Sequence, residues 1–523
     1  MAPHHVPGRP ARLRSGELIV SALDPGSFFS WDEPGTAGRT WPPDYAGQLA
    51  RARRSAGTDE AVVTGSGTIH GRPVAVIVSE FAFMGGSIGL DAADRLVGAV
   101  SRATAEGLPL LAATASGGTR MQEGTAAFVQ MVRIAAAIST HKRAGLPYLV
   151  YLRHPTTGGV LASWGLLGHV TVAEPGALIG FLGPKVYQAL HGAEFPAGVQ
   201  TAENLARHGI IDAVVAPRHL AALASRALGL LTDRDLSASA GARSPAGAAA
   251  PGTELSSDAA PPRDAAAAWS AVLATRRPAR PGVRQLLRHA AGGQVILLSG
   301  TGEGEAGDGM LLGLARFAGL SCVVLGHDRS SPASEHHLGP AALRVARRGM
   351  RLAAELNLPL VSVIDTPGAT LSQAGEEGGL SGEIARCLED LVRIDTATVC
   401  VLLGQGGGGG ALALLPADRV LAAANAWLSP LPPEGASAIL YGDTSLAPEM
   451  AHRQGIGAAD LARRGIVDVI VAERPDAADE PAAFVRRMGE AIGAAIRAAS
   501  ALPPPARAAA RIGRYANLAP AAS

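Results

Sequence analysis

Four short segments place consecutive glycines directly after an apolar run, and these glycines could do chemistry through their backbone. The segments are Phe83-Met-Gly-Gly86, Ser116-Gly-Gly-Thr119, Thr157-Gly-Gly-Val160 and Gly404-Gln-Gly-Gly-Gly-Gly-Gly410. Glycine reaches positive φ and lets a ligand approach the main chain closely. Where a helix begins at such a turn, its first N–H groups lack partners within the helix and point outward. The pattern therefore predicts sites that bind an oxyanion and can stabilise an enolate without any side chain.

Other roles for these glycines must be weighed. Any one pair could instead allow a strand to pack tightly against the following helix. Gly404-x-Gly406-x-x-Gly409 also has the spacing of a dinucleotide-binding turn. That motif needs an acidic residue at the end of the next strand to bind the ribose, and Arg419 to Asn425 contains none. The presence of four such pairs in one chain, two of them at matching ends of a repeat, favours the chemical role.

A similar pattern occurs twice along the chain. Leu108 to Gly118 and Leu358 to Gly368 each have the pattern of a buried strand that runs into a glycine turn. Late in each half, Arg207 to Val215 matches Arg463 to Val471. Because such internal repeats mark repeated structural units, the two halves are expected to share one fold.

The elements that position the turns follow an α/β pattern. Short runs of Val, Ile, Leu and Ala alternate with longer helical patterns, such as Thr125 to His141 and Gly382 to Ile394. Thr398 to Leu403 is continuously apolar, which predicts sheets covered on both faces. The glycine turns are therefore expected at the ends of buried strands.

One biased stretch separates the halves. From about Ser237 to Ala268 the residues are mostly Ala, Ser, Pro and Gly, without helical or strand periodicity. An Ala-rich helix is the alternative, but four prolines oppose it, because proline removes a backbone donor and clashes with the preceding turn. These prolines are Pro245, Pro251, Pro261 and Pro262. The stretch is predicted to be a linker.

The composition indicates a globular protein without a strong electrostatic field. Hydrophobic residues make up 47%, charged residues 17%, and the formal net charge is +1, so neither nucleic acid nor a membrane is expected as a partner. Cys322, Cys387 and Cys400 follow no metal or disulfide spacing, which favours a reducing compartment and no bound metal. Met1 to Gly16 lacks the apolar segment of a secretory signal. A cytoplasmic location is expected.

Several ordered motifs resemble those of the biotin-dependent acyl-CoA carboxyltransferases, in particular the beta and alpha carboxyltransferase subunits of acetyl-CoA carboxylase joined in that order. Five motifs in the first half are similar to beta-subunit motifs: Leu23 to Phe28, Phe81 to Gly89, Ser116 to Gly124, Pro155 to Val160 and Ala173 to Phe181. Three in the second half are similar to alpha-subunit motifs: Ile364 to Ala369, Gly404 to Ala413 and Pro433 to Ser437.

The resemblance implies an α/β fold with two crotonase-like (ClpP/crotonase) domains in tandem. It predicts a beta-type N-terminal domain at residues 16–236, a linker at 237–275 and an alpha-type C-terminal domain at 276–500. The active site is expected where a beta-type and an alpha-type domain meet, in a dimer or higher oligomer that often pairs domains of different protomers. No cysteine precedes Cys322, so the zinc ribbon that usually begins the beta subunit is expected to be absent.

The resemblance also assigns roles to the glycine turns. Two sets of residues are expected to form the oxyanion holes: Gly117 and Gly118 in the first half, and Gly409, Gly410 and Ala411 in the second. One hole would hold the thioester carbonyl of the acyl-CoA and the other the ureido oxygen of biotin. Four further glycines are expected to line the acyl-CoA or biotin pocket: Gly85, Gly86, Gly158 and Gly159. The chain departs from the family at Gln405 and Gly408, where alpha subunits usually carry Glu and Ser.

The activity implied is transfer of a carboxyl group from carboxybiotin on a carrier protein to acetyl-CoA, which gives malonyl-CoA for fatty acid or polyketide synthesis. In the family's route carboxybiotin releases CO2, the biotin anion removes the α proton, and the enolate attacks CO2. The expected partners are a separate biotin carboxyl carrier protein and biotin carboxylase. Three alternatives stay open: carboxylation of propionyl-CoA or another short acyl-CoA, decarboxylation by the same chemistry, and an inactive scaffold.

Overall fold

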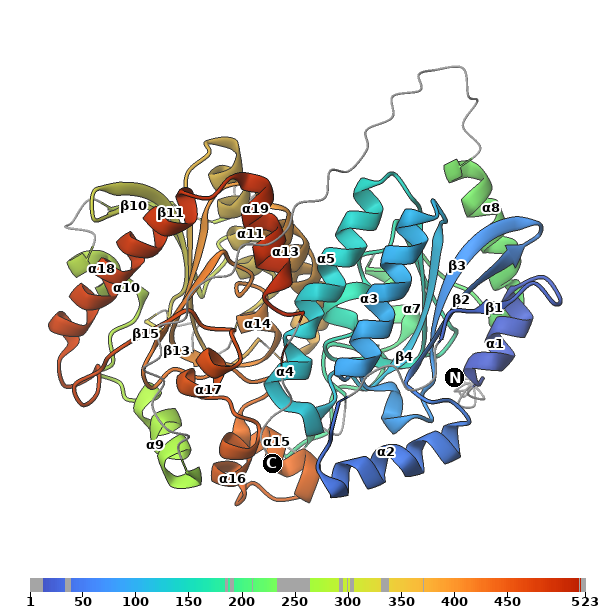
Figure 1. Cartoon of the computed structure of the whole chain (residues 1–523), viewed down its shortest axis with the longest axis horizontal. Helices are drawn as coiled ribbons and strands as arrows, with labels where there is room; N and C mark the ends of the chain where they lie inside the picture. The colour runs from blue at the N-terminus through green and yellow to red at the C-terminus, as the bar shows by residue number, and fades with distance from the viewer. Residues whose placement is uncertain are drawn as a thin grey trace, which may run out of the picture.

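The computed structural model contains two α/β halves, each built around one sheet (Figure 1). The residues that the structure describes are 13–32, 39–183, 187–188, 192–208, 210–232, 264–290, 295–298, 300–301, 305–330, 338–369, 371–516 and 518. The first half carries an eight-stranded sheet and the second a seven-stranded sheet. Each sheet takes all its strands from one half of the chain, as expected for two units in tandem.

The first half has short elements around a few long ones. Its helices are α1 (Ser15–Ala22), α2 (Pro43–Ala56), α3 (Leu90–Ala105), α4 (Gly124–Phe128), α5 (Gln130–Arg143), α7 (Ala202–Arg207) and α8 (Leu220–Thr232). Its strands are β1 (Phe29–Ser30), β2 (Val62–Ile69), β3 (Arg72–Ser79), β4 (Leu110–Ser116), β5 (Tyr148–Thr157), β6 (Val170–Ala173), β7 (Ile179–Gly180) and β8 (Ala213–Val214). Short helical turns are η1 (Met84–Gly86), η2 (Met121–Glu123), η3 (Leu161–Gly165) and η4 (Pro217–His219).

The second half repeats this plan and adds helices at its C-terminal end. Its strands are β9 (Val295–Leu298), β10 (Met310–Phe317), β11 (Leu320–His327), β12 (Leu360–Thr366), β13 (Thr398–Gly406), β14 (Arg419–Ala423) and β15 (Val469–Val471). Its first helices are α9 (Ala265–Thr275), α10 (Val283–Ala290), α11 (Pro340–Glu355), α12 (Gln373–Glu377), α13 (Leu380–Arg393) and α14 (Gly408–Leu412). The others are α15 (Pro433–Tyr441), α16 (Ala447–Arg453), α17 (Ala458–Arg463), α18 (Pro481–Ser500) and α19 (Pro504–Gly513).

The two sheets share one topology, as the internal repeat predicts. In the first, β2 and β3 pair antiparallel and β3, β4, β5, β6 and β8 follow in parallel. In the second, β10 and β11 pair antiparallel and β11 to β15 follow in parallel. The register shifts at the same place in both sheets, just before Ser116 pairs with Thr156 and just before Thr366 pairs with Gly406. The predicted fold class, two crotonase-like α/β units in tandem, is confirmed.

The strands that carry the glycine turns are buried along their whole length. Every residue of β4 and of β12 is buried, because helices cover both faces of these parallel strands. Each of β4, β5, β12 and β13 leads into a glycine-containing turn at its carboxyl end. Neighbouring parallel strands end at the same edge of a sheet, so the turns of each half lie side by side.

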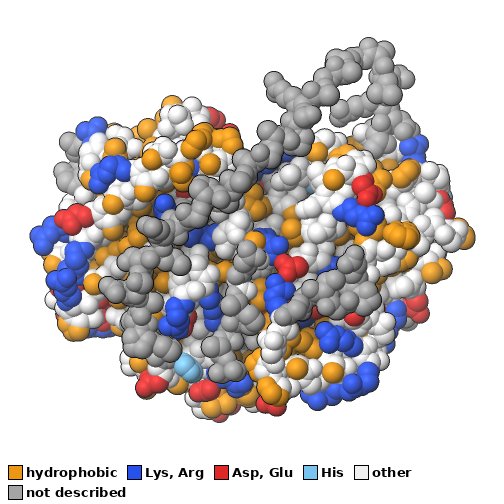
Figure 2. Space-filling model, in the orientation of Figure 1, with side chains coloured by type: hydrophobic (Ala, Val, Ile, Leu, Met, Phe, Trp, Pro, Cys, Tyr) orange, Lys and Arg blue, Asp and Glu red, His pale blue; other side chains and the backbone are white. Residues whose placement is uncertain are grey.

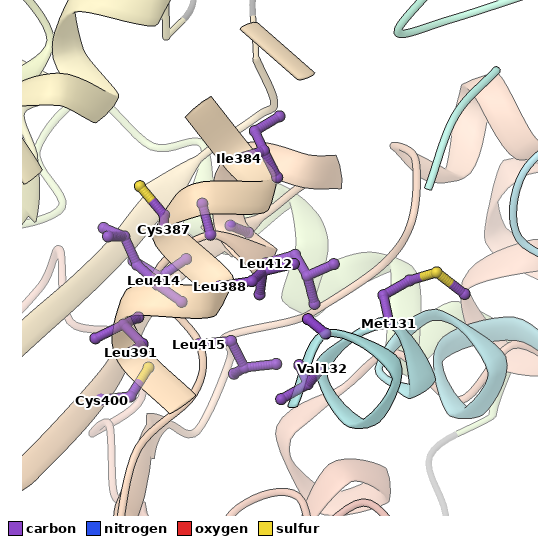
Figure 3. Packing of buried hydrophobic residues seen from close by; sticks show 14 of the residues in the cluster. Met131, Val132, Ile384, Cys387, Leu388, Leu391, Cys400, Leu412, Leu414 and Leu415 are labelled. Carbon is purple, nitrogen blue, oxygen red and sulfur yellow. The ribbon is translucent and has the colours of Figure 1, made fainter. Parts of the chain in front are cut away.

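The two halves pack together through a continuous apolar core. Helix α5 and the turn η3 of the first half contact α13 of the second half. Figure 3 shows Met131 and Val132 of α5 facing the side of the second half that carries Leu388 and Leu412. This packing fixes the carboxyl-end turns of one sheet relative to those of the other.

The structure places a helix at the end of the predicted linker. Residues 265–275 at the end of the predicted linker form helix α9, whose N-cap Asp264 accepts a hydrogen bond from the Ala267 N–H. All four prolines that opposed a helix precede Asp264, and the Ala-rich sequence after it has high helix propensity. Residues 237–263 lie outside the described part of the chain.

Charges, membrane spans, metal-binding groups and cysteines can each be described for the described part of the chain. Basic and acidic side chains are interspersed on the face drawn in Figure 2. None of the helices described here is long and apolar enough to cross a membrane. Within the described ranges, no group of three or more His, Cys, Asp or Glu side chains is placed to hold a metal ion. The three cysteines are buried and unpaired.

Candidate active site

Gly117 and Gly118 follow β4 in a turn whose shape requires glycine. Gly118 has a φ of +106°, and a β-carbon there would lie 3.2 Å from the Gly159 nitrogen. The Gly117 N–H donates to the Gly85 carbonyl at 2.8 Å, and the Gly118 N–H donates to Ser116 Oγ at 3.0 Å. Both expected donors therefore already have acceptors within the protein.

The next turn, after β5, presents two backbone donors, at Gly159 and Val160. Gly158 has a φ of +65°, and its N–H donates to the Phe181 carbonyl at 2.9 Å. Among the residues that the structure describes, no acceptor lies within hydrogen-bonding distance of the N–H groups of Gly159 and Val160. A β-carbon on Gly159 would lie 2.9 Å from Thr119 Oγ1. Within the described part of the chain, the first half thus offers free N–H groups at Gly159 and Val160.

The equivalent turn of the second half follows β13 and leads into α14. Gly408 has a φ of +60°, and its N–H donates to the Ser429 carbonyl at 2.9 Å. The N–H groups of Gly409 and Gly410 have no acceptor within the described ranges. They lie in the first turn of α14, where a helix cannot satisfy its own donors. The Ala411 N–H instead donates at 3.4 Å to the carbonyl four residues before it.

The turn after β12 shows which residues of the second half correspond to which residues of the first half. Gly368 takes the place of Gly118, because its N–H donates to Thr366 Oγ1 at 3.2 Å just as the Gly118 N–H donates to Ser116 Oγ. Pro367 precedes it and has no N–H. The structural equivalents of Gly409 and Gly410 are therefore the two residues after Gly158, and the two sets expected from the sequence come from different positions of the repeat.

Gly85 and Gly86, expected to line a pocket, support the turn after β4. They have φ values of +67° and +64°, and the Gly85 carbonyl accepts the Gly117 N–H. A β-carbon on Gly86 would lie 2.0 Å from the Ala115 carbonyl oxygen. The structure thus brings Gly85, Gly86 and the glycines after β5 together around Gly117 and β4.

Buried charges hold the first-half turns and are not free for catalysis. Arg120 donates to Glu60 Oε1 at 2.5 Å and to Glu123 Oε1 at 3.4 Å. The Tyr45 hydroxyl donates to the same Glu123 oxygen at 2.5 Å. Burial raises the pKa of Glu123. Because the Arg120 N–H also bonds the Ile88 carbonyl, this network braces the segment that pairs with the turn after β4.

A second buried group lies beside the second-half turns. Burial lowers the pKa of His327 to about 3, so the ring is neutral, and its Nδ1 accepts the Asp365 N–H at 3.2 Å. Asp365 Oδ1 accepts the Gln405 N–H at 3.1 Å, and Arg329 donates to the other carboxylate oxygen at 3.2 Å. Burial raises the pKa of Asp365. These side chains hold the end of β13 in place.

Glu376 is a residue of this region that the sequence did not place here. It lies in the first turn of α12, after the N-cap Ser372. Its Oε1 also accepts the Phe181 N–H at 2.6 Å and Gln200 Nε2 at 2.7 Å, both from the other half. Burial raises the pKa of Glu376 to about 7. The contact joins residues 195 positions apart, so only a pattern spanning both halves could have revealed it.

Comparisons with known proteins place the chain in a family. Residues 44–510 match the family model described as the carboxyl transferase domain. The chain is 58% identical to the probable biotin-dependent acyl-coenzyme A carboxylase beta3 subunit of Mycobacterium tuberculosis, over 97% of this chain and 99% of that protein. It is 39% identical to the acetyl-coenzyme A carboxylase carboxyl transferase subunits beta/alpha of Salinispora arenicola, over 93% and 87%. A structure of transcarboxylase 12S aligns over 94% of this chain and 90% of its own, with a TM-score of 0.37 and 22% identity.

The chain belongs to the carboxyl transferase domain family. It is the carboxyltransferase subunit of a biotin-dependent acyl-CoA carboxylase. The expected reaction class and the dependence on biotin are thereby confirmed, as is the resemblance to beta and alpha subunits joined in one chain.

Proposed function

We propose that the chain transfers a carboxyl group from carboxybiotin, presented on a biotin carboxyl carrier protein, to acetyl-CoA, and so forms malonyl-CoA. The observation that carries this proposal is the pair of equivalent turns after β5 and β13, each with two free N–H groups. Two oxygens gain negative charge in this reaction: the ureido oxygen of biotin and the thioester oxygen of the acyl-CoA. Two backbone sites match these two oxygens in number and in chemistry.

The proposed donors are Gly159 and Val160 in one hole and Gly409 and Gly410 in the other. Removing one preorganised donor from an oxyanion hole typically lowers kcat by about 100- to 1,000-fold, so these N–H groups would supply much of the catalysis. The other residues named from the sequence would shape the holes, because their N–H groups have acceptors within the protein. These residues are Gly117, Gly118 and Ala411.

The residues present fit bound carboxybiotin, because the free donors can hold an oxyanion and the glycines admit a close approach. Carboxybiotin, when bound, supplies CO2 and a basic ureido nitrogen. The turns would hold the thioester oxygen as it becomes negative and keep the α carbon beside the carboxyl donor. His327 is not required as a base, because it is buried, neutral and already accepts the Asp365 N–H.

Apolar side chains lie beside the second-half turn. The ring of Phe181 and the Cδ1 of Ile384 each lie 2.9 Å from the position of a β-carbon on Gly409, and Leu338 lies 3.2 Å from one on Gly410. The Salinispora relative is named for acetyl-CoA, whereas the Mycobacterium relative is named for acyl-CoA only. Acetyl-CoA is therefore the proposed substrate, with propionyl-CoA as the next acyl group to test.

The organisation of the protein completes the proposal. Residues 16–236 and 276–500 would be the beta-type and alpha-type domains, and the assembly would be a dimer or a higher oligomer in the cytoplasm. The partners would be a biotin carboxyl carrier protein and a biotin carboxylase, which together regenerate carboxybiotin at the expense of ATP.

The test is a reconstituted carboxylation assay with this chain, biotin carboxylase, biotinylated carrier, ATP and bicarbonate. We expect malonyl-CoA from acetyl-CoA, with a kcat/KM above that for propionyl-CoA. A higher kcat/KM for a longer acyl-CoA would show that the longer acyl-CoA is the preferred substrate. The enzyme would still be a carboxyltransferase. Binding of acyl-CoA without carboxyl transfer in either direction would contradict the proposed reaction.

A further inference from the structure

Phe181 touches both glycine turns that carry free donors. Its carbonyl accepts the Gly158 N–H at 2.9 Å, directly before the first-half donors. Its ring lies 2.9 Å from the position that a β-carbon on Gly409 would occupy, so it packs against the second-half turn. The backbone of one residue thus shapes one turn while its side chain confines the other.

Glu376 holds Phe181 in that position from the second half. Its Oε1 accepts the Phe181 N–H at 2.6 Å and Gln200 Nε2 at 2.7 Å. Gln200 Nε2 also donates to the Leu182 carbonyl at 2.7 Å, and a β-carbon on Gly180 would lie 2.3 Å from this nitrogen. The segment around Phe181 is therefore clamped to Glu376 through its main chain.

The need to hold the two halves together does not explain why a carboxyl group is buried here. Burying a carboxyl group is costly, and apolar packing holds an interface at lower cost. The neighbouring Glu377 also bridges the halves, through Asn204 Nδ2 at 3.1 Å and His208 Nε2 at 3.8 Å. It makes these contacts at a more exposed position. Glu376 is distinguished by its hydrogen bond to the main chain of Phe181.

We propose that Glu376 and Phe181 are positioning residues that join the two oxyanion turns, so that each turn keeps its donors aimed correctly only while α12 is docked on the other half. This inference rests on the proposed function of the turns. Neither residue needs to contact a reacting atom. The orientation of the Gly159 and Gly409 donors depends on one shared contact, and loss of that contact would disturb both holes together.

The kinetic test compares Glu376→Ala with Glu376→Gln and with the matched control Glu377→Ala. We expect Glu376→Ala to lower kcat by about 10- to 100-fold, as misplaced catalytic groups do, with the KM for acyl-CoA changed less than about threefold. Glu376→Gln keeps an oxygen that accepts the Phe181 N–H and should recover most of kcat. Glu377→Ala should leave kcat within about twofold of the wild type. Equal losses of kcat in Glu376→Ala and Glu377→Ala would overturn the inference.

Amide hydrogen exchange of the full chain tests the same inference without turnover. In Glu376→Ala we expect exchange at least about tenfold faster in peptides covering Gly158 to Val160 and Gly408 to Ala411, since both turns lose one support. Glu377→Ala should leave both peptides unchanged. Faster exchange in only one peptide, or in neither, would contradict a shared contact. If the wild-type chain transferred no carboxyl group but both peptides responded, the proposed function would fail while the positioning role stood.

Discussion

The two halves present equivalent turns, yet they support them differently. In the first half the turn after β4 contains Gly117 and Gly118 and rests on the buried network around Arg120. In the second half the corresponding residues are Pro367 and Gly368, and the nearby buried group is neutral His327. The parts that agree are the two free N–H groups that follow Gly158 and its counterpart. What both halves preserve is the set of donors, whereas the means of support differ.

The helix that follows each turn also differs. Val160 carries a side chain where the second half has Gly410, and the first-half turn leads into the π-helical η3 instead of a short α-helix. The second-half turn therefore carries one side chain fewer at the two donor positions. We therefore expect corresponding variants in the two halves to differ in effect.

The largest expected effect follows removal of a donor from the second half. Gly410→Pro deletes the N–H at a helix position that needs no intrahelical bond, and kcat should fall by about 100- to 1,000-fold. Gly410→Ala adds a similar β-carbon, 3.2 Å from Leu338, but keeps the N–H and should retain most activity. Steady-state carboxyl transfer measures both variants. Equal kcat values for the two variants would show that the Gly410 N–H does not contribute to catalysis.

The next largest effect distinguishes the turn after β4 from the corresponding turn after β12. Gly118→Val must adopt a φ of +106° and places a β-carbon 3.2 Å from Gly159, whereas Gly368→Val has a φ of +153° and open space around it. Each unfavourable φ costs about 1–3 kcal/mol, and only the first variant adds a steric clash. We expect Gly118→Val to lower both the melting temperature and kcat more than Gly368→Val. The reverse order would contradict the tight contact between the first-half turns.

The fold could be predicted from the sequence because the same local pattern occurs in both halves. Gly404 to Gly410 was recognisable because glycines follow an apolar strand and precede a helix, and the fold followed from the repeat of such units. The resemblance assigned the donors of the first half to Gly117 and Gly118. Spacing along the chain does not reveal that the Gly85 carbonyl accepts the Gly117 N–H and Ser116 Oγ the Gly118 N–H. Glu376 was missed because its partners lie in the other half.

The smallest expected effect is a pH dependence of stability at the boundary between the halves. Burial raises the pKa of Glu376 from 4.5 to about 7, so the folded chain binds more protons than the unfolded chain between these values. Its contribution to the free energy of unfolding therefore falls as pH rises through this window, by roughly 3 kcal/mol in total. Relative to the wild type, Glu376→Gln should gain melting temperature from pH 5 to pH 8.

Glu377 provides the opposite comparison. The hydrogen bond from Asn204 lowers the pKa of Glu377, so its contribution to stability is present above its ordinary pKa and is lost as pH falls. Relative to the wild type, Glu377→Gln should not gain melting temperature as pH rises. A parallel gain in both variants would show that Glu376 is not the source of the pH dependence.

The central claim is that the turns after β5 and β13 bind the two oxygens on which negative charge develops. The most direct measurement is a crystal structure of the chain with acetyl-CoA or a stable analogue bound. We expect the thioester oxygen to lie within about 3 Å of two N–H groups of one turn, either those of Gly159 and Val160 or those of Gly409 and Gly410. A thioester carbonyl bound away from both turns, or held by a side chain, would contradict it.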